Sequence, residues 1–248
     1  MKKVLFATAM AVAALVSAPA LAQGYVGASG TYNKVDAMGS SDHTNWYDVF
    51  GAVVAPVNDT FAFQFDGDVS WTNSNNVSND TIPSGNAHFY RETENSKLGA
   101  FVGAADVGGT IWDAGIEGQA FLPSSNIGGA IGYFKDDDFN VDGWAAQGNG
   151  ALFINDNFDL YGSLGYISAS GGGADVTGWK GGVGAEYQLS STPVSFFAEY
   201  DHGDINDFDL TTDGVTVGVT YSWSGTLRER NHRGPSLSGL AGLVTLFH

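Results

Sequence analysis

An acidic stretch near the middle of the chain has the residue types and spacing of a calcium-binding loop. Asp138, Asn140 and Asp142 alternate with other residues and precede Gly143, which matches the first half of an EF-hand loop. A complete EF-hand also needs a helix on each side and a glutamate at its twelfth position, where this chain has Asn149. We therefore expect no EF-hand. The two alternatives are a weak calcium site formed by Asp138, Asn140 and Asp142 in an outer loop, and a solvated acidic loop.

The histidines show no spacing that is typical of catalysis. None of them lies in a G-x-S-x-G or an H-E-x-x-H motif, the arrangements that many hydrolases use. The histidines are His43, His88, His202, His232 and His248. We therefore expect no enzymatic activity and, apart from the weak calcium site, no cofactor.

The charge of the chain argues against nucleic acid as a partner. The sequence has 27 acidic and 10 basic residues, a formal net charge of −17. Phosphate binding needs lysine and arginine, so this balance suits cations rather than nucleic acid. The chain has no cysteine, and 35 of its 248 residues are glycine. Stability must therefore come from packing or from a closed architecture, without disulfides.

The N-terminus has the three parts of a secretory signal peptide. A basic start at residues 1–3 is followed by an apolar run over residues 4–16 and by an A-x-A site at residues 20–22. We predict that residues 1–22 are a signal peptide and that the protein is exported. The apolar run is too short for a transmembrane helix, and we expect no helical membrane span in the mature chain.

Apolar and polar side chains alternate along most of the remaining chain. Between Val215 and Trp223, apolar residues occupy every second position, and Phe61, Phe63 and Phe65 alternate with other residues in the same way. A period of two over about ten residues predicts a β-strand with one apolar and one polar face. The chain is therefore predicted to be all-β.

The number and spacing of the strands indicate a closed barrel. The predicted strands are 24–34, 44–56, 60–71, 86–91, 97–105, 110–122, 126–134, 141–154, 158–168, 176–189, 193–201 and 212–223. If residues 91–97 are not a turn, the count falls from twelve to ten. Short connections alternate with longer polar ones, as in transmembrane barrels with short periplasmic turns and longer outer loops. We predict an antiparallel transmembrane β-barrel over residues 23–224.

The position of the large aromatic residues favours this barrel over a soluble β-sandwich. Aromatic side chains recur near the ends of the predicted strands, as the two interfaces of a membrane require. They are Trp46, Trp71, Trp112, Tyr133, Trp144, Tyr166, Trp179, Tyr200 and Trp223. The opposite faces carry mainly polar residues and glycine, with few large apolar residues to fill the core of a sandwich.

With this hairpin series and its last strand, the sequence resembles the small outer-membrane β-barrel proteins of Gram-negative bacteria, in the porin-like superfamily. The strand from Val215 to Trp223 is similar to the aromatic-ended signal by which such barrels are recognised for insertion. The resemblance implies a bacterial outer-membrane location, contact with its lipid and lipopolysaccharide, and insertion by the barrel-assembly machinery. Members of the family commonly end at that aromatic residue, whereas this chain continues from Ser224 to His248.

The predicted inward faces of the strands are acidic. The candidate pore-lining residues are Asp66, Asp68, Asp113, Glu117, Asp159, Lys180, Glu186, Glu199 and Asp201. An acidic lining favours the passage of cations. We therefore predict a porin-like barrel for passive diffusion of small cations or small polar solutes. The alternative is a structural or surface-interaction barrel that does not conduct, because small barrels can fill their own interior.

The residues after the last strand form a basic and then an apolar segment. Arg228, Arg230 and Arg233 lie in the first part of residues 225–248, which we predict to be a periplasmic C-terminal tail. The spacing of Leu237, Leu240, Val244 and Phe247 is that of a short amphipathic helix. The tail is either disordered or a plug in the periplasmic mouth, with its arginines against the acidic lumen.

Overall fold

The computed structural model describes residues 23–37, 39–73, 81–171, 174–206, 209–240 and 243. The strands are β1 (Gln23–Ala37), β2 (Ser40–Pro56), β3 (Phe61–Asn73), β4 (Thr81–Thr93), β5 (Ser96–Asp106), β6 (Thr110–Leu122), β7 (Ser125–Asp136), β8 (Val141–Asn155), β9 (Phe158–Gly171), β10 (Ala174–Gln188), β11 (Val194–Ile205) and β12 (Leu210–Ser222). A short helix, α2 (Leu227–Arg233), follows the last strand. The predicted signal peptide lies outside the described residues.

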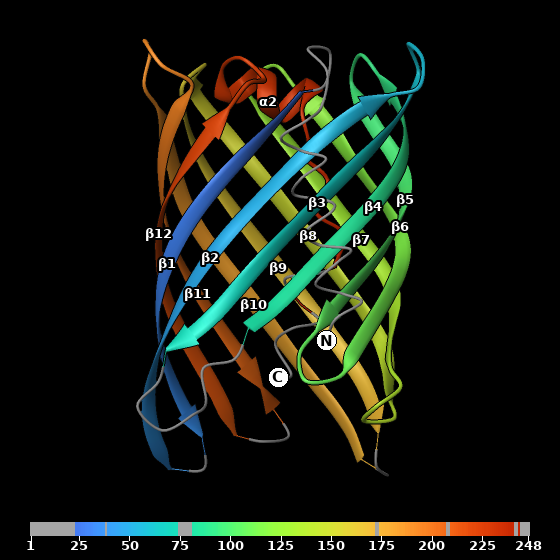
Figure 1. Ribbon diagram of the computed structural model, residues 1–248, viewed down its shortest axis with the longest axis vertical. Coiled ribbons are helices and arrows are strands. Elements are labelled where there is room, and N and C mark those ends of the chain that lie inside the picture. The colour runs from blue at the N-terminus through green and yellow to red at the C-terminus, as the bar shows by residue number, and fades with distance from the viewer. Residues whose placement is uncertain are drawn as a thin grey trace.

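The strands form one closed antiparallel barrel in which each strand pairs with its neighbours in sequence (Figure 1). The barrel closes between β1 and β12, which pair from Tyr25↔Ser222 to Ala37↔Leu210. The predicted twelve-stranded barrel is therefore confirmed. The alternative of ten strands is wrong, because β4 and β5 pair as a hairpin around a turn at residues 94–95.

Several strands extend farther than the sequence pattern predicted. The sequence predicts a loop between the strands 24–34 and 44–56, yet β1 and β2 leave only residues 38 and 39 between them. Likewise, β9 and β10 leave only residues 172 and 173 of the predicted loop over 169–175. The polar composition of these segments predicts loops. In a closed barrel, however, their backbone groups continue the hydrogen-bond ladder with the adjacent strand.

The outer surface of the barrel exposes more large apolar side chains than the surface of a protein surrounded by water normally does. Leu98 and Val183, for example, expose 68% and 64% of their surface, and Ile116 and Ile127 each expose 62%. These residues belong to different strands, so the apolar surface extends around the barrel. An exposed apolar surface of this extent is expected to contact lipid.

Most of the predicted aromatic residues lie on this outward surface. The exposed ones are Trp71, Trp112, Tyr133, Trp144, Tyr166, Trp179, Tyr200 and Trp223. The prediction is wrong for Trp46, because the outward face of β2 runs through Tyr47 and Val49, which are exposed. Successive side chains of a strand point to opposite faces, so Trp46 faces the interior.

Candidate functional site

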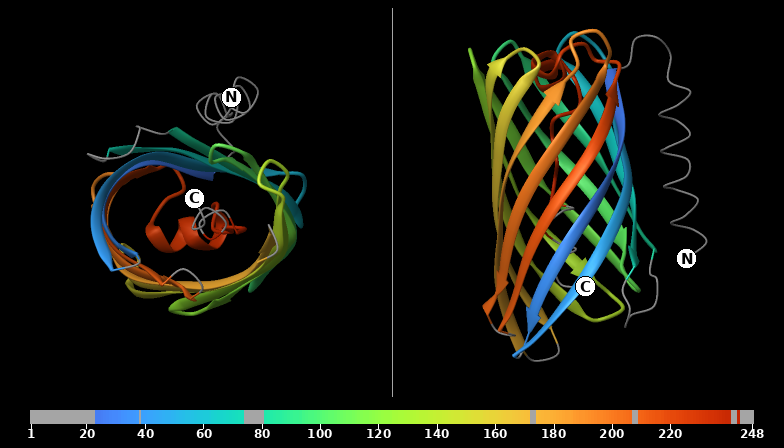
Figure 2. Two further views of the ribbon diagram at one scale, coloured as in Figure 1. Left: turned by 90° about the horizontal axis from the view of Figure 1, so that it is seen from below. Right: turned by 90° about the vertical axis from the view of Figure 1, so that its left-hand side faces the viewer.

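The interior of the barrel contains the residues that follow β12. Figure 2 shows α2 inside the ring of strands rather than outside it. The chain turns inward at Gly225, whose φ of +92° and close approach to Glu229 suit a residue without a Cβ atom. We call residues 224–240 together with Leu243 the luminal segment. The described part of the tail thus has the arrangement of a plug, one of the two alternatives drawn from the sequence.

The helix of the luminal segment begins with a capping box. The Thr226 hydroxyl accepts a hydrogen bond from the Glu229 N–H (3.2 Å), and the Glu229 carboxylate accepts one from the Thr226 N–H (2.9 Å). The helix is therefore formed by the basic part of the tail, residues 227–233. Residues 236–240, in which the leucine spacing predicted a helix, are not helical. No helical segment in the described part of the chain has the length and hydrophobicity needed to cross a membrane.

A buried ion pair joins α2 to the barrel wall. Arg230 Nη1 and Nη2 donate to the two carboxylate oxygens of Glu186, at 2.9 and 2.5 Å. Glu186 also accepts a hydrogen bond from the Ser195 hydroxyl. Burial lowers the pKa of the Arg230 guanidinium, but the charge of Glu186 more than offsets this, so the pKa is raised above its ordinary value. The guanidinium therefore stays charged, and its two hydrogen bonds tie the helix to β10.

A second cation, Lys97 of β5, holds the chain just after the helix. Its side chain is buried, and Nζ donates to the Gly234 carbonyl at 2.7 Å and to the Ser236 hydroxyl at 3.0 Å. The ammonium also lies 5.3 Å from the Tyr90 ring centre and 5.7 Å from the Phe121 ring centre. A buried ammonium needs acceptors, and here the luminal segment supplies them.

A network of ionisable side chains lies where the luminal segment reaches the middle of the wall. Both nitrogens of the buried His88 ring face carboxylates, with Nδ1 2.5 Å from Glu117 and Nε2 2.6 Å from Asp66. The second oxygen of Glu117 accepts from the Gly239 N–H at 3.2 Å. Asp66 also accepts from Asn86 at 2.9 Å. The network thus connects three strands, β3, β4 and β6, to the luminal segment.

Apolar side chains of the luminal segment fit into apolar parts of the wall. Leu240 and Leu243 are buried in a cluster with Phe101, Phe134 and Ile167. A second cluster surrounds Leu237; its wall residues are Val54, Ala62 and Tyr90. The expectation that the inner faces carry few large apolar residues is therefore wrong. Phe101, Phe134 and Ile167 are on the inner face, and together with the luminal segment they form a packed core in part of the lumen.

All of the predicted pore-lining residues lie on inward-facing positions, opposite the exposed apolar residues of their strands. The structure brings Asp66 and Glu117 together through His88, and it places Asp159 beside Glu186 across the β9–β10 pair. The remaining predicted residues lie elsewhere on the wall. Lys180 contacts Asp201 at 3.0 Å, Asp68 accepts from Ser84, Asp113 is buried near His88, and Glu199 is on β11.

The predicted pore-lining set omitted several inward-facing ionisable residues, among them Asp48, His88, Lys97 and Asp136. The outward positions of their neighbours Phe89 and Leu98 would have placed His88 and Lys97 inside, because side chains alternate along a strand.

The acidic stretch between β7 and β8 forms a tight turn at residues 137–140. Asp138 accepts a hydrogen bond from the Thr110 N–H (3.1 Å), whereas Asp142 accepts one from the Tyr133 hydroxyl (2.9 Å). Asn140 lies between them with a φ of +53°. No cluster of three or more His, Cys, Asp or Glu side chains with metal-binding geometry occurs among the residues described. The calcium site stays a prediction.

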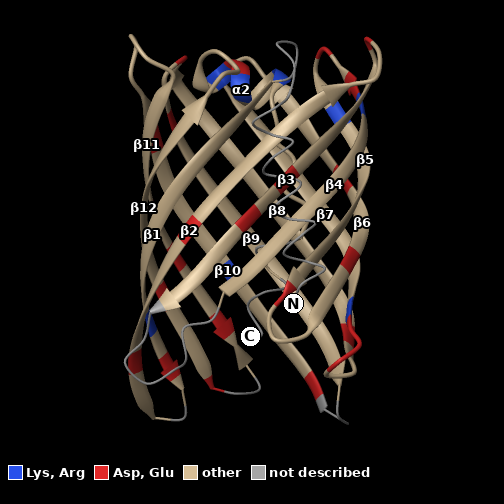
Figure 3. Ribbon diagram, in the orientation of Figure 1, with Lys and Arg blue, Asp and Glu red and all other residues tan. Residues whose placement is uncertain are grey.

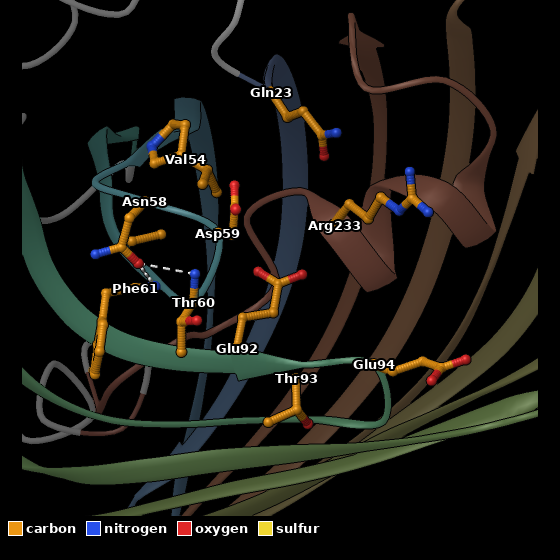
Figure 4. A pocket seen from close by; sticks show the side chains of 12 residues that line it. Gln23, Val54, Asn58, Asp59, Thr60, Phe61, Glu92, Thr93, Glu94 and Arg233 are labelled. Atoms are coloured by element: carbon orange, nitrogen blue, oxygen red, sulfur yellow. Dashed lines mark hydrogen bonds between the residues drawn. The ribbon is translucent and has the colours of Figure 1, made fainter.

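A pocket of about 590 Å³ opens beside α2 at the end of the barrel that carries the helix (Figure 4). Arg233 lies on one side of it, and Asp59, Glu92 and Glu94 lie on the others. Figure 3 shows that the basic residues of α2 gather at this end, whereas acidic residues are distributed along the barrel. The luminal segment therefore brings positive charge to a wall that is rich in carboxylates.

The closed barrel with an apolar exterior has the fold of outer-membrane porins and channels, in agreement with the predicted outer-membrane location. No family model and no curated protein matches the sequence. Among solved structures, the chain is similar to an outer-membrane channel from Pseudomonas putida F1, with 10% identity and a TM-score of 0.61, covering 83% of this chain and 97% of that one.

Two solved porins show the same likeness. NanC porin is 12% identical with a TM-score of 0.60, covering 79% of this chain and 98% of that one. KdgM porin in complex with disordered oligogalacturonate is 12% identical with a TM-score of 0.52, covering 79% of this chain and 99% of that one. At such identities the likeness shows the shared barrel fold.

Proposed function

We propose that the protein is a porin-like channel of the bacterial outer membrane, through which small cations or small polar solutes diffuse when the luminal segment is displaced. The observation that carries this proposal is the inward position of the carboxylates on the wall of a closed barrel. The luminal segment is not a strand of the barrel, and the pairing of β1 with β12, which closes the barrel, does not include it.

The distribution of charge supports a preference for cations. Asp68, Glu199 and Asp201 lie on inward-facing positions of the wall and are not ligands of the luminal segment. Lys180 compensates part of this charge through Asp201. A surplus of fixed negative charge in a narrow lumen attracts cations and repels anions.

A second candidate is a barrel that never conducts and serves as a structural or surface-interaction protein. The packing of Leu240 and Leu243 into the wall favours this candidate, because a filled lumen leaves no path for solutes. The two candidates differ in whether the luminal segment ever leaves the lumen. They therefore predict different currents across a membrane.

The experiment is a recording in planar bilayers under a salt gradient. It compares the full chain with the Leu240→Asp variant, in which a carboxylate replaces a fully buried leucine and disfavours the filled lumen. The channel proposal predicts rare openings of the full chain, frequent openings of the variant, and a reversal potential of cation-preferring sign in both. Silence of both proteins supports the non-conducting barrel, and an anion-preferring reversal potential contradicts the proposed selectivity.

A further inference from the structure

The barrel wall recognises the main chain of the luminal segment. Gln64 accepts hydrogen bonds from the N–H groups of Ser236 (3.1 Å) and Leu237 (3.2 Å), and its Nε2 donates to the Leu237 carbonyl (2.6 Å). Gln147 donates a hydrogen bond to the Gly239 carbonyl, and the Gly239 N–H donates one to Glu117. Main-chain hydrogen bonds are how extended peptides are held in many recognition sites. This part of the wall therefore binds a peptide main chain that is not helical.

The wall also recognises two hydroxyl groups of the segment. The Ser236 hydroxyl donates to Gln119 Oε1 at 2.6 Å. The Ser238 hydroxyl accepts from Gln147 Nε2 at 2.9 Å and from Asn149 Nδ2 at 3.3 Å. Each serine thus lies opposite polar side chains of the wall, so a small hydroxylated residue fits at both positions.

Two apolar sockets and one glycine position complete the arrangement. Leu237 packs against Tyr90, and Leu240 is fully buried beside Phe101. Between them, Gly239 has a φ of +55°, and an added Cβ atom would lie 3.2 Å from the Phe101 ring. Residues with a side chain rarely adopt this conformation, so glycine is favoured at this place. The wall is therefore shaped for the order Ser-Leu-Ser-Gly-Leu.

Most of the wall residues that make these contacts are deeply buried while the segment is in place. Gln64 and Lys97 each expose 1% of their surface, and Glu117 and Gln119 are also buried. Buried polar groups cost free energy when they lack hydrogen-bond partners. While the segment is in place, its hydrogen bonds with these groups are shielded from water, so each of them contributes to holding a chain in the lumen.

We propose that the lumen is a binding site for peptides of the type Ser-Leu-Ser-Gly-Leu that turn at the glycine, and that residues 236–240 occupy this site as a resident ligand. The ligand class follows from the contacts: a main chain read by Gln64, Glu117 and Gln147, two hydroxyls, and two leucine side chains. A peptide with this pattern binds in trans when the resident segment is displaced. This inference goes beyond the proposed channel, since binding does not require conduction.

The test begins with the full chain, folded before any cut is made. A protease site is inserted between Gly225 and Thr226, because Gly225 is exposed at the start of the luminal segment. After cleavage, the barrel is separated from unbound peptide in detergent and analysed by mass spectrometry. A fluorescent peptide with the sequence of residues 226–243 is then added, and its anisotropy is measured with cleaved and uncleaved protein.

Two matched peptides test the sequence pattern. The Leu240→Ala peptide is expected to bind at least about 30-fold more weakly, which corresponds to about 2 kcal/mol for the loss of a buried leucine side chain. The Arg233→Lys peptide changes an exposed residue of the same segment but keeps its charge, and it is expected to bind as the unmodified one does. On the wall, Gln64→Leu removes the main-chain contacts and weakens binding, whereas the outward Phe65→Leu leaves it unchanged.

Each outcome decides the proposal. Retention of the cut segment, or its replacement by the added peptide with the expected sequence dependence, supports it. Loss of the cut segment without binding of the added peptide overturns it, as does equal binding of the Leu240→Ala peptide. The channel proposal is tested independently of the binding site. A barrel that binds peptide but passes no current refutes the channel alone. A conducting barrel that binds no peptide refutes the binding site alone.

Discussion

The guanidinium of Arg230 lies against the carboxylate of Glu186, 44 residues earlier in the chain, with two hydrogen bonds of 2.9 and 2.5 Å. Both side chains are about nine-tenths buried. The contact links the segment after the last strand to the inner wall of the barrel. Because one partner belongs to the luminal segment and the other to the wall, this ion pair is suited to hold the lumen closed.

Removal of Arg230 is expected to release the luminal segment. In Arg230→Met, Glu186 is left as an unpaired buried charge, which typically costs about 3–5 kcal/mol. Trypsin should then cleave after Arg228 much faster than in the unmodified protein. The control is Arg233→Lys, which changes an exposed arginine of the same helix but keeps its charge and should leave this rate unchanged. The double variant Glu186→Gln/Arg230→Met should recover part of the protection, and equal rates in all of these proteins would contradict the role of the pair.

A change in the wall is expected to have the same effect without altering the segment. A Cβ atom at Gly165 would lie 2.3 Å from the Leu243 side chain, so Gly165→Val fills the place of that leucine. Overpacking of this kind costs about 1–3 kcal/mol. The chain has no cysteine, so the accessibility of the segment can be followed by thiol labelling of Ser236→Cys.

In that background, Gly165→Val should raise the labelling rate about tenfold, in line with the cost of overpacking. The control is Gly148→Val, since the nearest atom to an added Cβ atom there is 3.8 Å away. The steric account is contradicted if both valine variants are labelled at the rate of the parent.

His232 is expected to make closure of the lumen dependent on pH. Burial lowers the pKa of its imidazole, and the nearby charges of Arg228, Lys97 and Arg233 lower it further from the ordinary value of 6.5. The ring is stacked on Phe121, with 4.5 Å between ring centres. The displaced segment therefore takes up a proton at a pH where the bound one does not, so binding weakens as the pH falls below 6.5.

The measurement is the labelling rate of Ser236→Cys between about pH 7 and pH 5, relative to the same rate in a His232→Phe background. This ratio removes the pH dependence of the labelling reagent. We expect the ratio to rise as the pH falls. A ratio that is constant or decreases with falling pH would show that His232 does not weaken closure on protonation.

The inward carboxylates are expected to set ion selectivity. Glu199→Gln and Asp201→Asn remove negative charge from the wall, and the second change also frees Lys180 from its partner. The ratio of cation to anion permeability should fall in each variant. The control is Asp213→Asn, because Asp213 lies on an outward-facing position with Tyr200 and His202. If Asp213→Asn changes selectivity as much as Asp201→Asn does, the inner wall does not determine it.

The barrel was predictable because strand alternation is local in the sequence. The period of two from Val215 to Trp223 suffices to define the outward face of β12, and the same reasoning holds for most other strands. The prediction of the outward face failed for Trp46, which faces the interior, whereas its neighbour Tyr47 faces outward. Residue type alone does not indicate the face when both of two successive residues are aromatic.

The interior site was only partly predictable. The charges suggested that arginines of the tail would meet an acidic lumen, but the pairing of Arg230 with Glu186 depends on how the chain folds back after β12. The helix could have been placed correctly, since Thr226 and Glu229 have the spacing of a capping box. The contacts of Gln64 with the main chain at residues 236–237 depend on tertiary structure and have no sequence signal.

The central claim, that the luminal segment closes a cation-conducting lumen, is tested most directly by one recording. The protein with a protease site between Gly225 and Thr226 is inserted in a planar bilayer, and the unit current is measured before and after cleavage from the side of α2. The account predicts that the unit current, seen only in rare openings before the cut, becomes sustained after the cut segment is washed away, with a reversal potential of cation-preferring sign. A current that does not change after loss of the segment, or an anion-preferring reversal potential, would contradict it.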